Sequence, residues 1–236
     1  MTMQVGMIGT DGILIASETR TTNTPRWTNW GIPRVTFNST KIRISHERGI
    51  IVSCARNMET ANHLATQIIE NLKDEDFQYP IFPIEAMARN VLSAVEERRN
   101  DAQCLVALRG PTPQLFLFQY GMVNGEWGPH CQKMEGKAVA GDNVNAAAFW
   151  PERYYERRPI ERLIPLAAHL IVSASKLNSG SISGLEILTC TSTEIRRLSE
   201  DSIRSLERQC TKWDEDIGNL FLSYREQFTY APNVVG

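Results

Sequence analysis

The sequence lacks any run of the roughly 18 continuous apolar residues that a membrane-spanning helix needs. It also lacks an excess of one charge, because 25 Lys and Arg residues stand against 27 Asp and Glu residues and the net charge is −2. A basic N-terminal segment followed by an apolar run is missing too, so we expect no signal peptide. Balanced charge argues against binding to nucleic acid or to an acidic membrane surface. These absences predict a cytoplasmic protein with neither partner.

Motifs for metals and cofactors are equally scarce. The five cysteines, at positions 54, 104, 131, 190 and 210, form no CxxC pair, which argues against a zinc site and against a disulfide scaffold. The four histidines show no HExxH spacing, and GxSxG, Walker and GxGxxG motifs are absent. We therefore expect no metal and no cofactor.

Hydrophobic periodicity does divide the chain into elements. Short β-favouring runs come first, the first two joined by an Asp-Gly turn, and two amphipathic helices follow them. The expected strands are Gln4–Ile8, Ile13–Ser17, Lys41–Ile44, Gly49–Ala55, Cys104–Leu108, Gln114–Gln119, Lys137–Ala140 and Leu185–Thr191, and the expected helical stretches are Met58–Leu72, Ile84–Val95, Asn143–Lys176 and Leu198–Leu220. Between the early strands, Arg20–Thr40 has no periodicity and is interpreted as a long loop.

This order of elements predicts an α+β protein. Each early helix has one apolar stripe, so each covers one face of a sheet. Two stacked antiparallel sheets flanked by helices on both outer faces, a four-layer αββα sandwich, would bury every stripe. The sequence shows no internal repeat and no linker, so we expect one domain over residues 1–236.

The N-terminus carries the most specific pattern. Thr2 follows Met1 and opens directly into the first strand, and Asp11-Gly12 leads through the second strand to Glu18-Thr19-Arg20. With Lys41-Ile42, Ala138-Val139-Ala140-Gly141 and Ser179-Gly180-Ser181, this order resembles proteasome β-type subunits and their bacterial homologues, which are N-terminal-threonine peptidases of the N-terminal nucleophile (Ntn) hydrolase superfamily. The resemblance runs from Thr2 to about Thr191 and implies an Ntn-hydrolase fold.

The resemblance also implies roles for individual residues. Removal of Met1 would make Thr2 the nucleophile and its α-amine the base, since α-amines titrate near 7.7–8.0. Lys41 would support the nucleophile as a cation, paired with Glu18, so we expect Lys41 within salt-bridge reach of Glu18 and a few ångströms from Thr2. Further implied roles are Ser181 as a hydrogen-bond partner of the amine, the backbone N–H of Ala55 as oxyanion donor, and Thr22, Ser53 and Asn57 as substrate contacts.

Two positions depart from the family pattern. Asn178 stands where an aspartate usually orients the amine, and Asp142 stands where a serine is usual. The carboxylate missing at Asn178 and the one present at Asp142 would keep the local charge constant. The two departures also favour a rival hypothesis, in which the chain is a catalytically weak or inactive shell or scaffold protein. An Ntn amidase acting on a small amide is a third hypothesis.

The resemblance finally implies assembly and substrate. We expect a double ring of identical subunits, with seven per ring as the first choice and six as the second, that encloses Thr2 and cuts peptides or unfolded proteins. The sequence does not decide whether an ATP-dependent unfoldase feeds the chamber. Trp27 and Trp30, in the long loop, would either grip substrate or pack on a neighbouring subunit.

Overall fold

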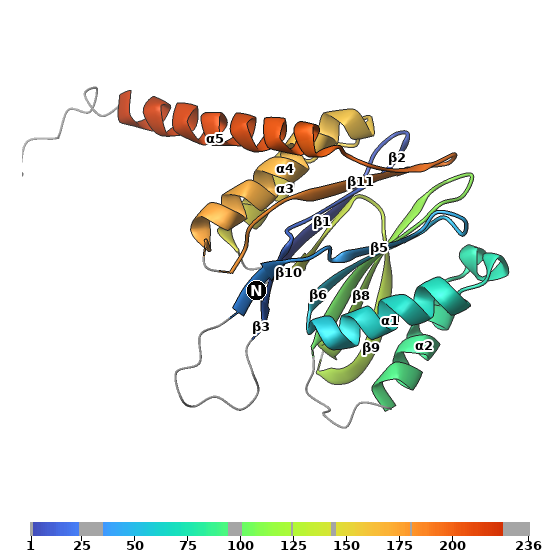
Figure 1. Cartoon of the computed structure of the whole chain (residues 1–236). Coiled ribbons are helices and arrows are strands. Elements are labelled where there is room, and N and C mark those ends of the chain that lie inside the picture. Colours follow the sequence, from blue (N-terminus) through green and yellow to red (C-terminus); the bar gives the residue numbers. More distant parts are fainter. Residues whose placement is uncertain are drawn as a thin grey trace, which may run out of the picture.

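A computed structural model describes residues 2–23, 35–93, 101–123, 125–142, 145–179 and 181–223. Two five-stranded antiparallel sheets lie face to face (Figure 1). The first has the order β10-β1-β2-β11-β12, with β1 at Met3–Ile8, β2 at Gly12–Ser17, β10 at Lys137–Gly141, β11 at Glu186–Thr191 and β12 at Ile195–Arg197. The second has the order β5-β6-β7-β8-β9, with β5 at Ile42–Ser45, β6 at Ile50–Arg56, β7 at Ala102–Leu108, β8 at Gln114–Val123 and β9 at Glu126–Met134.

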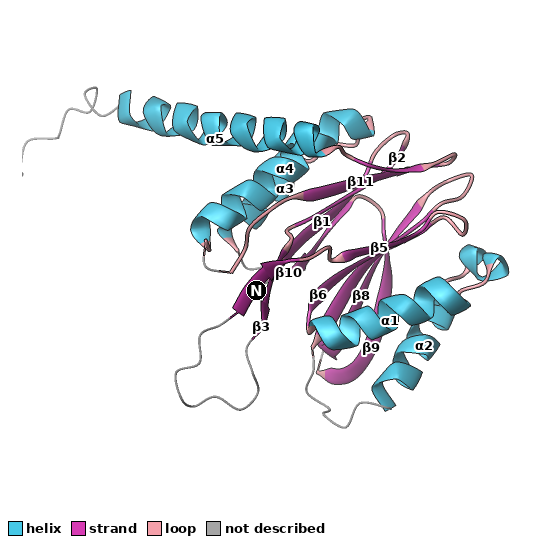
Figure 2. Cartoon of the chain, viewed as in Figure 1, coloured by secondary structure: helices cyan, strands magenta, loops and turns pink. Residues whose placement is uncertain are grey.

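Helices cover the outer face of each sheet (Figure 2). On the second sheet lie α1 (Met58–Asn71) and α2 (Ile81–Ser93), with the short 3-10 helix η1 (Asp74–Gln78) between them. On the first sheet lies α4 (Ile160–Leu177), preceded by η2 (Ala146–Ala148) and α3 (Phe149–Tyr154), and α5 (Glu200–Ser223) packs on α4. The expected four-layer αββα sandwich is confirmed.

Three apolar clusters hold these layers together. One lies between the first sheet and α4 with α5, one lies between the second sheet and α1 with α2, and the third fills the space between the sheets. Because both faces of each sheet are covered, β1, β2 and β7 are buried at every position. Within β1, Met3, Val5 and Met7 face α4, while Gln4 and Gly6 turn toward the other sheet.

Two sequence interpretations need correction. The ends of the predicted loop Arg20–Thr40 are strands, since β3 (Arg20–Asn23) pairs with β4 (Val35–Asn38) in an antiparallel ribbon. Residues 24–34, with Trp27 and Trp30, lie outside the described part of the chain. The strands β9 and β12 were not expected, because β9 contains Gly128 and Pro129 and β12 spans only three residues.

Within the described ranges, no helix combines the length and the apolar character that crossing a bilayer requires.

Candidate active site at the start of the first strand

Thr2 precedes β1 and is held between β10 and β2. Its side chain is 5 % exposed, and its backbone C=O accepts a hydrogen bond of 2.7 Å from the N–H of Asp142, the residue that follows β10. The next C=O, of Met3, accepts one of 3.1 Å from the N–H of Glu18 at the end of β2. Ladder pairing on both sides therefore fixes where the Thr2 hydroxyl points.

Gly141 allows this close approach of β10 to Thr2. Its φ is +93°, and a Cβ atom built on it would lie 2.0 Å from the backbone oxygen of Thr2. A side chain at this position would therefore push Thr2 away, and glycine also tolerates the positive φ without steric cost.

Lys41 and Glu18 meet beside the nucleophile candidate. Lys41 Nζ donates to Glu18 Oε1 in a close ion pair and lies 3.4 Å from Thr2 Oγ1. The side chains of Lys41 and Glu18 are 2 % and 0 % exposed, so both are cut off from bulk water. Glu18 follows β2 and Lys41 precedes β5, so the pair joins the two sheets. The structure thus brings Thr2, Glu18 and Lys41 together, which is the arrangement that the resemblance led us to expect.

Burial works against both charges of this pair. Desolvation raises the pKa of the Glu18 carboxyl above its ordinary value, and the neighbouring Lys41 charge and its hydrogen bond oppose that rise. Desolvation likewise lowers the pKa of the Lys41 amine, and Glu18 opposes that fall. The amine is therefore a stronger acid than a lysine in water, and it faces a hydroxyl. This is an arrangement that can exchange a proton with Thr2 Oγ1.

Glu18 is also tied to the turn after α4. Its Oε2 accepts a 2.7 Å hydrogen bond from the N–H of Arg20, and the Arg20 guanidinium donates to the backbone C=O of Ser179. The same turn contains Asn178, the C-cap of α4, whose C=O accepts hydrogen bonds of 2.9 Å from the N–H groups of Ser181 and Ile182. No described hydrogen bond joins the Asn178 or Ser181 side chain to Thr2. Their predicted contact with the amine stays a prediction.

The backbone geometry of β6 bears on the predicted oxyanion donor. Cys54 donates its N–H to the C=O of Lys41 at 2.9 Å, and Asn57 donates to Asp101 at 3.0 Å on the opposite side of the strand. Alternation along the strand then turns the N–H of Ala55 toward β7, where Ala55 lies opposite Gln103. The N–H of Arg56, whose φ is +66°, is the next to face the β5 side. The N–H of Arg56 is thus a second candidate for the oxyanion donor, which the sequence analysis did not identify.

The predicted substrate contacts have mixed surroundings. Ser53 is fully buried and its Oγ has no hydrogen-bond partner in the described part of the chain. Asn57 caps α1, because its Oδ1 accepts a 3.0 Å hydrogen bond from the N–H of Thr60. Thr22 lies in β3 opposite Thr36, and the description does not extend to its side chain. These three residues are therefore not joined to Thr2 by any contact described.

Gln103 belongs to the site and was missed from the sequence. Its side chain is buried at the second position of β7, and its Oε1 accepts a 2.7 Å hydrogen bond from the N–H of Gly141. It thereby ties β10 to the second sheet next to Thr2. A polar residue inside the otherwise apolar strand Ala102–Leu108 was the signal for it. Among the described residues, no group of three His, Cys, Asp or Glu side chains is placed to hold a metal ion.

Stacked antiparallel sheets between helical layers, with a threonine at the start of the first strand, define a proteasome-like sandwich of the Ntn type. Solved structures with this fold include Anbu (ancestral beta-subunit) from Yersinia bercovieri, at 14% identity and a TM-score of 0.67 with 100% of both chains covered. They also include the Anbu complex from Pseudomonas aeruginosa, at 16% identity and a TM-score of 0.70 with 100% of both chains covered. Anbu from Hyphomicrobium sp. strain MC1 has 16% identity and a TM-score of 0.68, with 97% of this chain and 100% of that chain covered. At these identities the likeness shows the fold alone.

The family expected from the sequence, a bacterial proteasome homologue of the β-type peptidases, is therefore corrected. The similar structures are Anbu proteins, a family distinct from it that has a proteasome-like fold. No family model and no curated protein matches the chain.

Proposed function

We propose that the chain is an Ntn hydrolase that cuts peptide bonds with Thr2, made N-terminal by removal of Met1, as its nucleophile. Met1 itself lies outside the described residues. The observation that carries the proposal is the 3.4 Å contact between Lys41 Nζ and Thr2 Oγ1, with Lys41 held in a buried ion pair by Glu18. A cation buried beside a hydroxyl favours the alkoxide form that attacks a carbonyl.

The proposed reaction has two steps. Thr2 Oγ1 attacks the carbonyl carbon, the hydroxyl proton passes to the free α-amine of Thr2 and then to the leaving amine, and an ester to Thr2 forms. Water then hydrolyses this ester, which frees the acid product and the hydroxyl. The backbone N–H of Arg56, on the β5 side of β6, would stabilise the oxyanion in place of the N–H of Ala55, which faces β7. Asp142, Asn178 and Ser181 would surround the amine.

A test of this proposal is covalent labelling. A peptide epoxyketone reacts with a hydroxyl and an adjacent amine together, so intact mass should show one adduct per chain, and N-terminal sequencing should begin at Thr2. We expect Thr2→Ala to abolish the adduct, because the hydroxyl is missing, while the protein keeps its assembly and its circular dichroism spectrum. Cys190→Ala is a matched control, since that buried thiol lies opposite Ile13, at the other end of β2 from Glu18, and it should label normally.

The rival functions give different results in the same experiment. Wild-type protein that retains Met1, or that takes no label, would contradict the hydrolase and favour the scaffold hypothesis, which draws on the uncharged Asn178 and its lack of a described contact with Thr2. Labelling without cleavage of any casein-derived peptide, together with turnover of small amides, would favour the amidase.

We also propose that the chain assembles with itself in the cytoplasm. Leu220, Phe221 and Leu222 expose apolar side chains at the end of α5, and a groove lined by Trp150, Tyr154, Trp213 and neighbours lies between α3, α4 and α5. Apolar surface of this kind marks interaction sites. The Pseudomonas aeruginosa relative is described as a helical assembly. A repeated head-to-tail interface gives a ring or a helix according to a small difference in rotation, so a double ring with seven or six subunits per ring is one outcome and a helix the other.

A further inference from the structure

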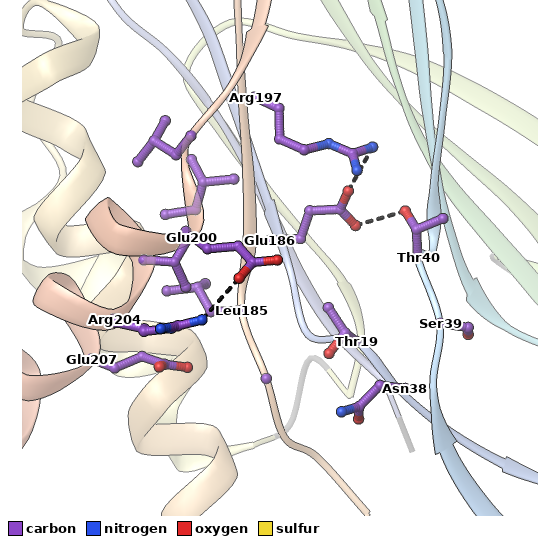
Figure 3. A pocket seen from close by; sticks show the side chains of 14 residues that line it. Thr19, Asn38, Ser39, Thr40, Leu185, Glu186, Arg197, Glu200, Arg204 and Glu207 are labelled. Carbon is purple, nitrogen blue, oxygen red and sulfur yellow. Dashed lines mark hydrogen bonds and ion pairs between the residues drawn. The ribbon is translucent and has the colours of Figure 1, made fainter.

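A cavity is lined by chain neighbours of both residues of the buried ion pair. It has a volume of about 470 Å³ and lies between β11, β12, the first turns of α5 and residues 38–40 (Figure 3). Two of its lining residues are chain neighbours of the ion pair, since Thr19 follows Glu18 and Thr40 precedes Lys41. The wall of this cavity therefore includes the residue next to each charge.

One carboxylate in the wall is buried. Glu186 is 7 % exposed, its Oε2 accepts a 2.7 Å hydrogen bond from Thr40 Oγ1, and its Oε1 lies 2.9 Å from a guanidinium nitrogen of Arg197. Figure 3 shows Glu186 between these two partners. Since a buried carboxylate is costly without such partners, Thr40 and Arg197 together hold it in place. Glu186 belongs to the first sheet and Thr40 leads into the second, so the contact bridges the sheets.

The Thr40 hydroxyl also forms a hydrogen bond across Lys41, with the backbone of Ile42. The N–H of Ile42 points to Thr40 Oγ1 at 3.3 Å, which makes Lys41 the central residue of a turn closed by the threonine side chain. The single hydroxyl proton has two acceptors in reach, the Glu186 carboxylate at 2.7 Å and the C=O of Ile42 at 3.1 Å. The shorter and charged acceptor is the stronger one, so the turn is anchored to Glu186. On its other side, the C=O of Lys41 accepts from Cys54.

We propose that Glu186 is a positioning residue that, through Thr40, fixes the backbone of Lys41 so that Nζ stays at the Thr2 hydroxyl. This inference rests on the proposed function, in which Lys41 assists Thr2. Glu186 touches none of the reacting atoms in this proposal. Its effect is on the rate of attack and not on how tightly a peptide binds.

The test uses the full chain and the peptide epoxyketone as probe. Thr40→Val removes the hydroxyl and keeps the shape, and Glu186→Met removes the acceptor. Each should lower the maximal rate of labelling at Thr2 by about 10- to 100-fold and leave the concentration for half-maximal rate unchanged, because a misplaced catalytic group costs rate and not binding. Thr40→Ser, which keeps the hydroxyl, should label at nearly the wild-type rate.

A double variant and a matched control separate positioning from general damage. If both side chains act through one hydrogen bond, Thr40→Val with Glu186→Met is no slower than either single variant, whereas two independent defects would multiply. Glu200→Gln alters another carboxylate of the same cavity, paired with the exposed Arg204, and should leave the rate unchanged. Multiplying defects, or wild-type labelling by Thr40→Val, would overturn the inference.

Amide hydrogen exchange keeps this test independent of the hydrolase proposal. The Ile42 amide should exchange faster in Thr40→Val and in Glu186→Met than in wild type. In Glu200→Gln it should exchange at the wild-type rate. If the wild-type protein takes no label, the proposed function fails, and exchange alone then decides whether Glu186 and Thr40 hold the turn. Unchanged exchange at Ile42 in both variants would show that they do not.

Discussion

At the scale of residues, the site depends on an ion pair whose burial penalises its charges. Lys41 and Glu18 each face a desolvation cost that the partner offsets, and for Glu18 the N–H of Arg20 offsets it as well. Such a pair adds little to stability, and breaking it leaves an uncompensated charge. A pair of this cost, 3.4 Å from Thr2 Oγ1, is the arrangement that the proposed function requires.

The direction of the Lys41 pKa shift predicts the pH dependence of labelling. The rate should rise with pH as the Thr2 amine loses its proton near 7.7–8.0, and fall again as Lys41 loses its own proton below the ordinary lysine pKa of 10.5, because burial lowers that pKa. In Glu18→Gln the charge that raises the Lys41 pKa is gone, so the alkaline fall should move to still lower pH. Epoxyketone labelling rates from pH 6 to 11 measure both limbs.

A matched control for this profile is Glu75→Gln, which alters an exposed carboxylate paired with Lys73 far from the site. It should reproduce the wild-type curve. An alkaline limb that stays at the same pH in Glu18→Gln would mean that Lys41 is not the group that titrates there.

The contact of Lys41 with Glu18 beside Thr2 was expected from the resemblance to proteasome β-type subunits, and strand order alone would not have given it, because β2 and β5 lie in different sheets. Thr2, Glu18 and Lys41 stand at the ends of strands that hydrophobic periodicity predicts. The contact between Thr40 and Glu186 had no such signal, since the two residues are 146 positions apart and neither has a distinctive neighbourhood. The direction of the Ala55 N–H likewise depends on ladder alternation, which the sequence alone does not supply.

At the scale of elements, the strands with apolar residues were predictable from the sequence. The strands that form through backbone pairing with a neighbour, without an apolar pattern, were not. β9 has no apolar alternation and contains Pro129, yet it pairs with β8 along its whole length. It lies at a sheet edge, where proline is tolerated. β3 is a polar strand and β4 has only Val35 and Phe37 as apolar residues, and the two pair with each other apart from both main sheets. In these elements the tertiary partner decides the structure.

The contact between β10 and β1 gives a prediction at this scale. Gly141→Ala should destabilise the protein by about 1–3 kcal/mol for the backbone strain alone, and should also abolish labelling, because the added Cβ would meet Thr2 O. Urea unfolding and epoxyketone labelling measure the two effects. Gly125→Ala is the matched control, with a φ of +86° and no atom within 4 Å of its Cβ, and it should lose stability but keep labelling. Normal labelling of Gly141→Ala would contradict this account.

At the scale of the whole molecule, α5 packs against α4 along one part of its length and is exposed at its C-terminal end. Its first half lies against α4 through side chains such as Leu206, Cys210 and Trp213. Its last turns extend beyond α4 (Figure 1), and Phe221 there is 74 % exposed. A helix end of this kind is stabilised only if another surface covers it.

The last prediction follows from that exposed end. If α5 contributes to self-assembly, Phe221→Asp should shift the protein to smaller species, because a charge would be buried without a partner in the interface. The substitution lies outside the core, so the thermal unfolding of the separated subunit should change by no more than about 0.5 kcal/mol. Native mass spectrometry and light scattering measure the assembly. Arg208→Glu, which reverses an exposed charge on the same helix, should keep the wild-type assembly. An unchanged oligomer in Phe221→Asp would place the subunit interface elsewhere on the molecule.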